Sequence, residues 1–201
     1  MRIGLFGGTF SPPHLGHTRA ARCFVEDGEL DKLIVMPTYI SPHKVQDEYG
    51  TPEIRLELAH LAFDGLGEVS DYEIKQGGKS FTYLTLRYLR SEYPDAQICL
   101  CVGEDMFLSL DSWREADELM KNAEILCLMR ENGSESIVKA AKAEFEEAYG
   151  AKIKILKYSP LPVSSSEVRT KCASGEEFHS LVPTKVYEYI VENELYITED
   201  E

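Results

Sequence analysis

Two histidines spaced three residues apart follow a glycine-rich stretch near the start of the chain. The stretch is Gly7-Gly8-Thr9-Phe10-Ser11-Pro12-Pro13, and His14-Leu15-Gly16-His17 comes directly after it. Residues three apart on a helix lie on one face, so both imidazoles would point the same way. The unpaired N–H groups and partial positive charge of a helix start suit a phosphate, and Gly16 lets a ligand approach the backbone closely. This pattern predicts a phosphate-binding turn.

Other interpretations of these residues stay open. A Gly-Gly pair after a strand is often only a turn, and two histidines could be ordinary surface residues. Histidine pairs at helical spacing also bind zinc, but no third ligand at metal-site spacing is present in the sequence. We rank zinc below a phosphate, because the whole string of glycines and histidines is more specific than any of its parts.

A second candidate cluster lies far along the chain, in Ser164-Ser165-Ser166-Glu167-Val168-Arg169. Ser164 and Glu167 have the spacing of a capping box, so the simplest role of the first serine is to begin a helix. The same helix start offers hydroxyl and N–H groups, and Arg169 lies about one turn further on. We expect a second phosphate-binding site here, which is compatible with the capping role.

Three further loops contain candidate binding residues. Lys44 lies in a loop with two prolines and could supply a point charge to a phosphate. Asp105, two residues after Gly103, could hold a ribose hydroxyl or a cation, and Trp113 could stack on an aromatic ring. Arg130 follows a buried strand and could bind a phosphate or a carboxylate. Each also has a simpler interpretation. Lys44 could lie in a solvated loop and Asp105 could cap the following helix. Trp113 could pack in the core, and Arg130 could form a surface ion pair.

The elements that position these groups alternate along the chain. Apolar runs predict strands at residues 1–6, 33–36, 68–74, 98–102, 125–129 and 152–155, the last of them an exposed edge strand. Caps and helical spacing predict helices at 18–25, 115–121, 135–148, 165–173 and 184–192, and two more that begin near 51 and 82. This alternation predicts an α/β fold with a mostly parallel sheet and helices on both faces. Ligands bind such sheets beyond the carboxyl ends of the strands, so we expect the site there.

The composition limits the domain organisation, the partners and the compartment. A chain of 201 residues, 43% hydrophobic and 28% charged, suits one domain over 1–201, with a small helical subdomain at about 160–201. The net charge of −14 argues against nucleic acid and membrane partners but not against small anionic ligands. Five cysteines without a CxxC pair indicate free thiols and a cytoplasmic location.

Taken together, these residues resemble a known superfamily. The Gly7-Gly8-Thr9-Phe10 and His14-Leu15-Gly16-His17 strings and the distant serine run with Arg169 are similar to the paired HxGH and serine/threonine-rich motifs of nucleotidyltransferases. Pro42-His43-Lys44, Gly103-Glu104-Asp105, Trp113 and the terminal Leu181-Val182-Pro183 more narrowly resemble the bacterial nicotinate-nucleotide adenylyltransferase family. The similarity spans nearly the whole chain, in order, and implies a Rossmann-like fold of the HUP or nucleotidyltransferase type.

The resemblance implies transfer of AMP from ATP to nicotinic acid mononucleotide, which gives deamido-NAD and pyrophosphate. It implies that Mg²⁺ arrives with ATP and that there is no tightly bound cofactor. The alternatives are the same chemistry on nicotinamide mononucleotide or phosphopantetheine, a non-catalytic nucleotide sensor, and a metal-binding module built on His14, His17 and His43. A homo-oligomer also stays open.

The resemblance further implies a role for each candidate residue, with no metal ligand among them. The catalytic residues would be His14, His17 and Arg169. The ATP-binding residues would be Gly7, Gly8, Thr9, Phe10, Gly16, Gly103, Asp105, Ser164, Ser165 and Ser166. The acceptor-binding residues would be Lys44, Thr82, Thr85, Trp113 and Arg130.

Four positions depart from the family pattern. The family usually has an acid at Ser11, a different residue at Pro13, and a threonine at Ser166. Glu104 replaces a small residue and adds negative charge beside a site expected to bind anions. None of these departures removes a group to which the resemblance assigns catalysis.

Overall fold

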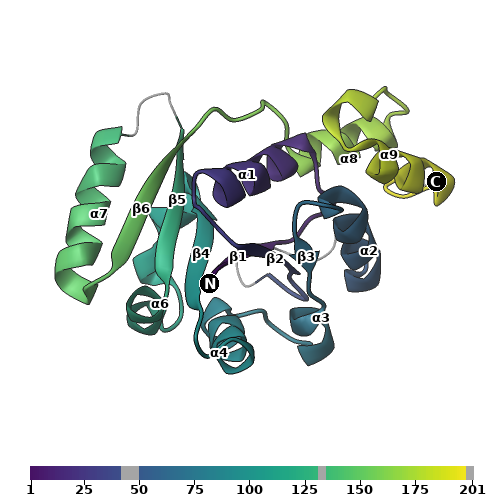
Figure 1. Ribbon diagram of the computed structural model, residues 1–201. Helices are drawn as coiled ribbons and strands as arrows, with labels where there is room; N and C mark the ends of the chain where they lie inside the picture. Colours follow the sequence, from purple (N-terminus) through teal and green to yellow (C-terminus); the bar gives the residue numbers. More distant parts are fainter. Residues whose placement is uncertain (42–49, 131–134, 198–201) are drawn as a thin grey trace.

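Six parallel strands form the centre of the computed structural model, which describes residues 1–41, 50–130 and 135–197 (Figure 1). The strands are β1 (Arg2–Gly8), β2 (Lys32–Pro37), β3 (Glu68–Val69), β4 (Gln97–Gly103), β5 (Glu124–Arg130) and β6 (Lys152–Tyr158), in the spatial order β3-β2-β1-β4-β5-β6. All five strand pairs are parallel. The Rossmann-like sheet predicted from the sequence is therefore confirmed.

The α-helices of the described residues are α1 (Leu15–Glu26), α2 (Pro52–Phe63), α3 (Tyr72–Gln76), α4 (Thr82–Glu92), α5 (Glu104–Phe107), α6 (Ala116–Asn122), α7 (Glu135–Tyr149), α8 (Ser165–Ala173) and α9 (Thr184–Glu192). Two short 3₁₀ turns, η1 (Leu110–Ser112) and η2 (His179–Leu181), complete these elements. The last two α-helices have the bounds that the sequence predicts. None of the helices in the described ranges combines the length and the apolar character that a membrane span requires.

Helices cover both faces of the sheet, because successive strand residues point to opposite sides. On one face, Cys99 and Cys101 of β4 share a core with Phe24 of α1, and α2, α8 and α9 add to it. On the other face, Leu100 of β4 packs with Leu119 of α6, and α4 and α7 complete that core. Figure 1 shows α1 on one side of the sheet and α4 and α6 on the other.

The five cysteines are all free thiols, as predicted, and Cys99, Cys101, Cys127 and Cys172 are buried. Burial raises the pKa of Cys99 to about 11 and that of Cys127 to about 12. The pKa of Cys101 is also raised well above its ordinary value, by the same loss of solvation. These thiols therefore stay protonated at neutral pH and pack as small apolar side chains.

The strand predicted over residues 68–74 is wrong beyond its second residue. Only Glu68–Val69 pairs with β2, and α3 begins at Tyr72. The ladder ends where Ser70 N–H donates to Val35. Tyr72 then stacks on Tyr88 of α4 with ring centroids 3.8 Å apart, so packing against a neighbouring helix overrides the extended pattern.

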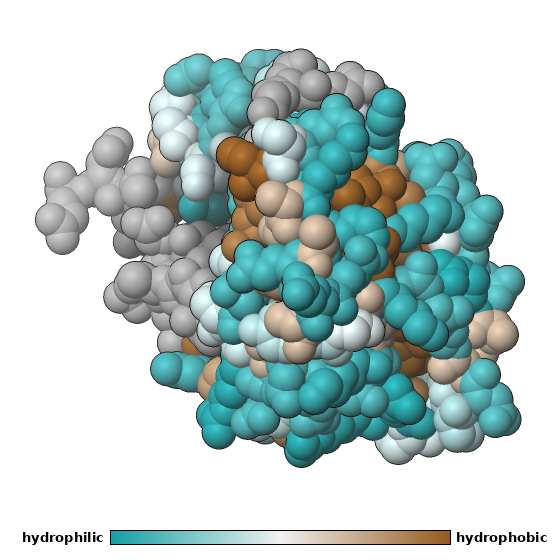
Figure 2. Space-filling model, turned by 90° about the vertical axis from the view of Figure 1, so that its left-hand side faces the viewer, coloured by the Kyte–Doolittle hydropathy of each residue, from teal (hydrophilic) through white to brown (hydrophobic). Residues whose placement is uncertain are grey.

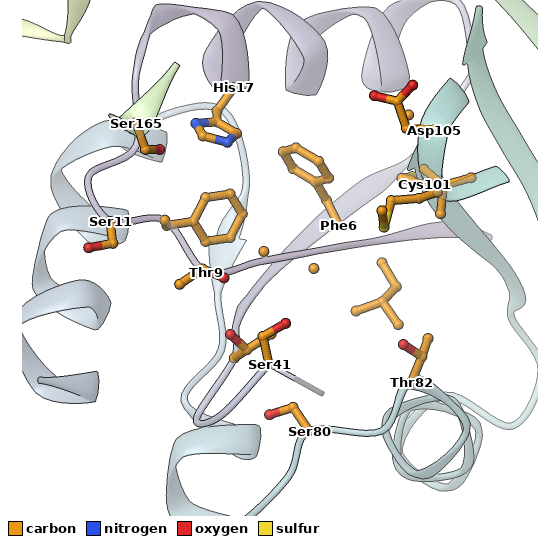
Figure 3. Close-up of a pocket in the computed structure, with 18 of the residues that line it drawn as sticks. Phe6, Thr9, Ser11, His17, Ser41, Ser80, Thr82, Cys101, Asp105 and Ser165 are labelled. Atoms are coloured by element: carbon orange, nitrogen blue, oxygen red, sulfur yellow. The ribbon is translucent and has the colours of Figure 1, made fainter. Parts of the chain in front are cut away.

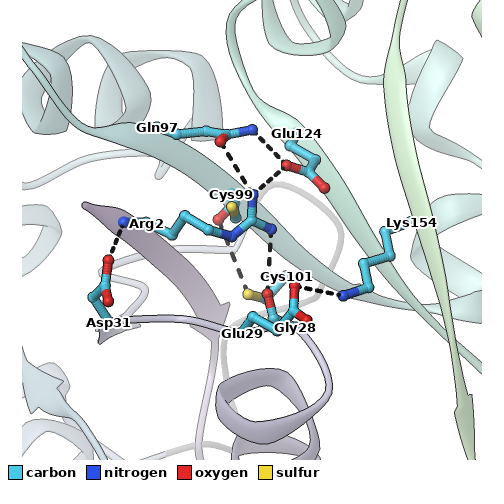
Figure 4. A network of polar contacts seen from close by, with 9 residues as sticks. All are labelled: Arg2, Gly28, Glu29, Asp31, Gln97, Cys99, Cys101, Glu124 and Lys154. Carbon is cyan, nitrogen blue, oxygen red and sulfur yellow. Dashed lines mark hydrogen bonds and ion pairs between the residues drawn. The ribbon is translucent and has the colours of Figure 1, made fainter.

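The amino ends of three strands are joined by Arg2 (Figure 4). Its guanidinium donates to Glu124 of β5 at 2.8 Å, to Gln97 of β4 at 3.1 Å and to Gly28 O at 3.2 Å. The hydrogen bond to Glu124 raises the pKa of Arg2 above its ordinary value. This network fixes the edge of the sheet opposite the carboxyl ends.

The two ends of the sheet differ in exposure. Among the described strands β6 pairs with β5 alone, so the predicted edge strand is confirmed. Lys152 on it is exposed, as the alternating pattern predicts, whereas Lys154 is half-buried. The face of the molecule that carries this end is largely hydrophilic, with separate hydrophobic areas (Figure 2). At the other end, α9 contacts α2, and Lys185 donates to Asp64 at 2.7 Å. The small helical subdomain at about 160–201 stays a prediction.

Phe145→Ala should destabilise the fold while leaving the carboxyl end of the sheet unchanged. Phe145 of α7 is 3% exposed and contacts Phe107 and Tyr149, with ring centroids 5.4 and 6.1 Å apart. Removal of a buried aromatic ring costs about 3–5 kcal/mol of the free energy of unfolding. Urea denaturation measures this loss, and a change below about 1 kcal/mol would contradict this packing.

Candidate active site

A cavity of about 900 Å³ opens at the carboxyl ends of β1, β2 and β4 (Figure 3). The order of the sheet reverses between β1 and β4, and a parallel sheet binds ligands at such a point. Most residues predicted for a site line this cavity. They are Gly7, Gly8, Thr9, Phe10, His14, His17, Thr82, Gly103, Asp105, Trp113, Ser164, Ser165, Ser166 and Arg169.

The two histidines are held by the start of α1. His14 is the N-cap, and its Nδ1 accepts from Gly16 N–H at 3.1 Å. His17 Nδ1 in turn accepts from His14 N–H at 3.2 Å, and the ring centroids are 3.8 Å apart. Because each Nδ1 accepts a hydrogen bond from a backbone N–H, each ring in its neutral form carries its own proton on Nε2. The pair is therefore two oriented N–H donors.

Burial keeps His14 uncharged at neutral pH. Its side chain is among the buried polar groups, and the loss of solvation lowers its pKa to about 4. Protonation of the ring would also compete with the bond from Gly16 N–H. The edge of Phe10 packs against His17, with ring centroids 5.3 Å apart, so a buried aromatic side chain supports the second imidazole.

The lack of a side chain at Gly16 makes room for the His14 ring and not for a ligand. A Cβ on Gly16 would lie 2.9 Å from two atoms of the His14 imidazole and 3.3 Å from Val163. Such a contact is too short, so a side chain at this position would displace His14. The close approach expected at Gly16 is thus that of a neighbouring side chain, and Gly16 does not line the cavity.

The start of α8 contacts the turn after β1. Ser165 Oγ donates to Pro12 O at 2.9 Å, and Arg169 donates to Ser11 O at 2.7 Å. Ser164 Oγ accepts from Glu167 N–H at 3.1 Å and caps the helix, as predicted. The structure therefore brings two helix starts, far apart in the sequence, to one cavity, and Figure 3 shows Ser165 near His17 and Ser11.

Arg55 supports this turn from behind, and the sequence analysis missed it. It lies on α2, is 3% exposed, and donates to Thr9 O at 2.9 Å and Tyr39 O at 2.8 Å. Tyr39 N–H donates to Ser80 Oγ at 2.9 Å, so the bridge extends to the segment before α4. Burial lowers the pKa of Arg55. The only signal for Arg55 in the sequence is that it falls on the apolar face of its helix.

Asp105 and Arg130 neutralise each other beside the cavity. Arg130 donates to Asp105 at 2.9 Å, and only Asp105 of the two lines the cavity. Glu104 is 5% exposed and accepts from Arg130 N–H at 2.9 Å. The extra acid noted in the sequence thus caps the end of β5 and does not line the cavity.

Of the other residues expected to bind the acceptor, some line the cavity and one is buried behind its wall. Thr82 and Trp113 line it, together with Ser80, Phe81 and Arg114, which the sequence analysis did not single out. Thr85 is 1% exposed, does not line the cavity, and donates to Glu73 at 2.6 Å. Burial raises the pKa of Glu73. Lys44 and His43 lie outside the described residues.

Comparisons with known proteins found a family model and relatives that match most of the chain. The model of a family described as cytidylyltransferase-like matches residues 5–171. A protein from Clostridium tetani named "probable nicotinate-nucleotide adenylyltransferase" is 33% identical over 194 residues, 96% of this chain and 97% of the relative. One of the same name from Gemmatimonas aurantiaca is 32% identical over 198 residues, 98% of this chain and 92% of the relative.

Solved structures share the fold. A nicotinic acid mononucleotide adenylyltransferase from Plasmodium falciparum, complexed with APC, has a TM-score of 0.76 at 15% identity and covers 97% of this chain and 96% of its own. The chain belongs to the cytidylyltransferase-like family. Within that family its relatives are nicotinate-nucleotide adenylyltransferases, which confirms the resemblance read from the sequence motifs.

Gly16→Ala should displace the His14 ring and raise the pKa of that histidine from about 4 toward its ordinary value. In the wild-type protein the pKa of His14 is lower in the folded state than in the unfolded chain, so the unfolded chain binds a proton at this imidazole more readily than the folded protein does. His14 therefore makes stability fall as pH decreases from its ordinary pKa of about 6.5 to its folded value. NMR titration of the imidazole resonances measures the shift. An unchanged pKa in Gly16→Ala would show that the ring tolerates the added methyl group.

Proposed function

We propose that this protein moves AMP from ATP to nicotinic acid mononucleotide, forming deamido-NAD and pyrophosphate in NAD biosynthesis. The observation that supports it most is the placement of His17 and Arg169 on one cavity with two helix starts. The curated relatives carry the name of this activity. A helix start with oriented donors suits a phosphate chain, and here two such starts meet.

The reaction joins two anions, so the chemistry depends on positioning. The phosphate oxygen of the mononucleotide attacks the α-phosphorus of ATP, and the bond to the β-phosphate bridging oxygen breaks as pyrophosphate leaves. The attacking phosphate is already ionised, so no side chain must remove a proton. Catalysis then requires alignment of the two substrates and donors aimed where negative charge increases.

We assign the triphosphate to the end of the cavity near α1 and α8. The Nε2–H groups of His14 and His17 would donate to phosphate oxygens, and His17 would stabilise the transition state. Arg169, with Ser165 and Ser166, would hold the β- and γ-phosphates. Because His14 is uncharged, its contribution is a hydrogen bond and the permanent charge comes from Arg169.

ATP would also contact the turn after β1 and the end of β4. Gly7, Gly8, Thr9 and Phe10 would shape the turn over the nucleotide, and Gly103 would let the backbone approach it. A Cβ on Gly8 would lie 2.7 Å from the Phe10 ring, so this glycine permits the ring's position. Asp105 lies at the cavity edge, where a ribose hydroxyl could meet its carboxylate.

We assign the acceptor to the region of Thr82 and Trp113, where the indole face would stack on the pyridine ring. Thr85 would act from behind, because its hydroxyl is donated to Glu73. Arg130 would hold Asp105 in place rather than contact the mononucleotide. For Lys44 we keep the acceptor-binding role that the resemblance implies, in which it supplies a point charge to a phosphate.

Mg²⁺ would offset the negative charge of the triphosphate and polarise it. Among the described residues no group of three or more His, Cys, Asp or Glu side chains could hold a metal ion. We therefore propose that phosphate oxygens and water supply most ligands of the ion. We also propose the cytoplasm as the compartment, from the free cysteines, and no nucleic-acid or membrane partner, from the net charge of −14. A homo-oligomer stays an open alternative, which the composition does not address.

An endpoint assay of pyrophosphate release tests the function directly. Purified protein with ATP and Mg²⁺ should use nicotinic acid mononucleotide, and use nicotinamide mononucleotide or phosphopantetheine less well. Equal rates with both mononucleotides would refute the nicotinate assignment. ATP binding without pyrophosphate release from any acceptor would instead indicate a nucleotide sensor.

His17→Ala should lower kcat by about 10²–10³, the usual cost of one preorganised donor at a developing charge. His60→Ala on α2 is the matched control, since it removes an exposed imidazole that is not among the residues lining the cavity. Circular dichroism and thermal melting should match wild type for both. Near wild-type turnover in His17→Ala would remove this residue from the mechanism.

A further inference from the structure

Two arginines are the permanent cations among the described residues that line the cavity. Arg169 lies at the start of α8, beside the serines assigned to the triphosphate. Arg114 directly follows Trp113 and shares its part of the cavity with Ser80, Phe81 and Thr82. Figure 3 shows Ser80 and Thr82 across the cavity from His17 and Ser165. The two cations therefore serve different ends of the site.

Aromatic rings brace the Arg114 side chain. Its guanidinium carbon lies 4.9 Å from the centroid of Phe81 and 5.9 Å from that of Tyr83. A guanidinium over a ring keeps its in-plane N–H donors available for another partner. In the part of the chain that the structure describes, no carboxylate forms an ion pair with Arg114.

Arg87 provides an internal contrast. It also packs over Tyr83, at 5.1 Å from the ring centroid, yet it donates to both oxygens of Glu118 at 2.6 Å. Arg87 is thus fully paired and does not line the cavity. Both arginines pack on aromatic rings, but among the described residues only Arg87 forms an ion pair with an acid, and only Arg114 lines the cavity.

The acids that line the cavity do not cancel the charge of Arg114. The lining acids in the described ranges are Asp105, which is paired with Arg130, and Glu73, which is buried and bonded to Thr85. In a protein of net charge −14, a cation left open toward a cavity points to an anionic group of the ligand. The guanidinium fork matches a carboxylate in particular.

We propose that Arg114 is a specificity-determining residue that binds the ring carboxylate of the acceptor and so favours nicotinate over nicotinamide. This inference rests on the proposed function. A carboxylate gains a charge-assisted hydrogen bond from the guanidinium, whereas a neutral carboxamide offers only its carbonyl oxygen and places an NH₂ against a group that can only donate.

The test compares Arg114→Gln, Arg114→Lys and the control Arg87→Gln with both mononucleotides. In Arg114→Gln, kcat/KM for nicotinic acid mononucleotide should fall by about tenfold, the range of a charged hydrogen bond. The loss should appear mainly in KM, and kcat/KM for nicotinamide mononucleotide should stay within about twofold. Arg114→Lys should recover part of the preference, and Arg87→Gln should retain all of it.

Each contrary result has a distinct meaning. An equal loss with both mononucleotides would show that Arg114 reads the shared phosphate, and would overturn the proposal. So would an unchanged preference in Arg114→Gln, or the same loss in Arg87→Gln. If the wild-type protein transfers no AMP, the proposed function fails first. Calorimetric binding of the two mononucleotides to wild type and Arg114→Gln then tests the carboxylate contact independently of turnover.

Discussion

The site depends on a contact between two segments that lie 153 residues apart in the sequence, the hydrogen bond from Ser165 to Pro12 O. Arg169 reinforces it by donating to Ser11 O. These carbonyls belong to the turn that leads into His14, so the same residues join α8 to the turn and place both helix starts on one cavity. Preorganised donors act without rearrangement during a reaction, so under the proposed function this contact would serve catalysis as well as the fold.

The charge pattern of the cleft is the reverse of that of the whole molecule. The chain carries a net charge of −14, yet the two acids among the described lining residues are either paired or buried. Behind the turn, Arg55 holds the carbonyls of Thr9 and Tyr39 and adds a buried positive charge. In a low-dielectric interior such a charge acts over a longer distance than it would in water. An acidic protein can thereby receive a polyanion.

Sequence reasoning succeeded where local rules decide the outcome. Strand and helix alternation follows from periodicity, the cap at Ser164 from hydrogen-bond chemistry and the free thiols from cysteine spacing, and the structure agrees. It failed where tertiary contacts decide. The end of β3, the partner of Thr85 and the bridge made by Arg55 depend on neighbours that no spacing reveals. Arg114 was missed because an arginine in the turn between η1 and α6 has no local signature.

The protonated state of the thiols has a consequence for chemical reactivity. The thiolate is the nucleophile that attacks alkylating agents and peroxides. Cys101 reaches the cavity wall with a pKa raised well above its ordinary value. The partly exposed Cys23 likewise has its pKa raised to about 12. Covalent inhibitors that carry a thiol-seeking warhead therefore have no activated sulfur in this pocket, and the cysteine there contributes shape and dispersion contacts only.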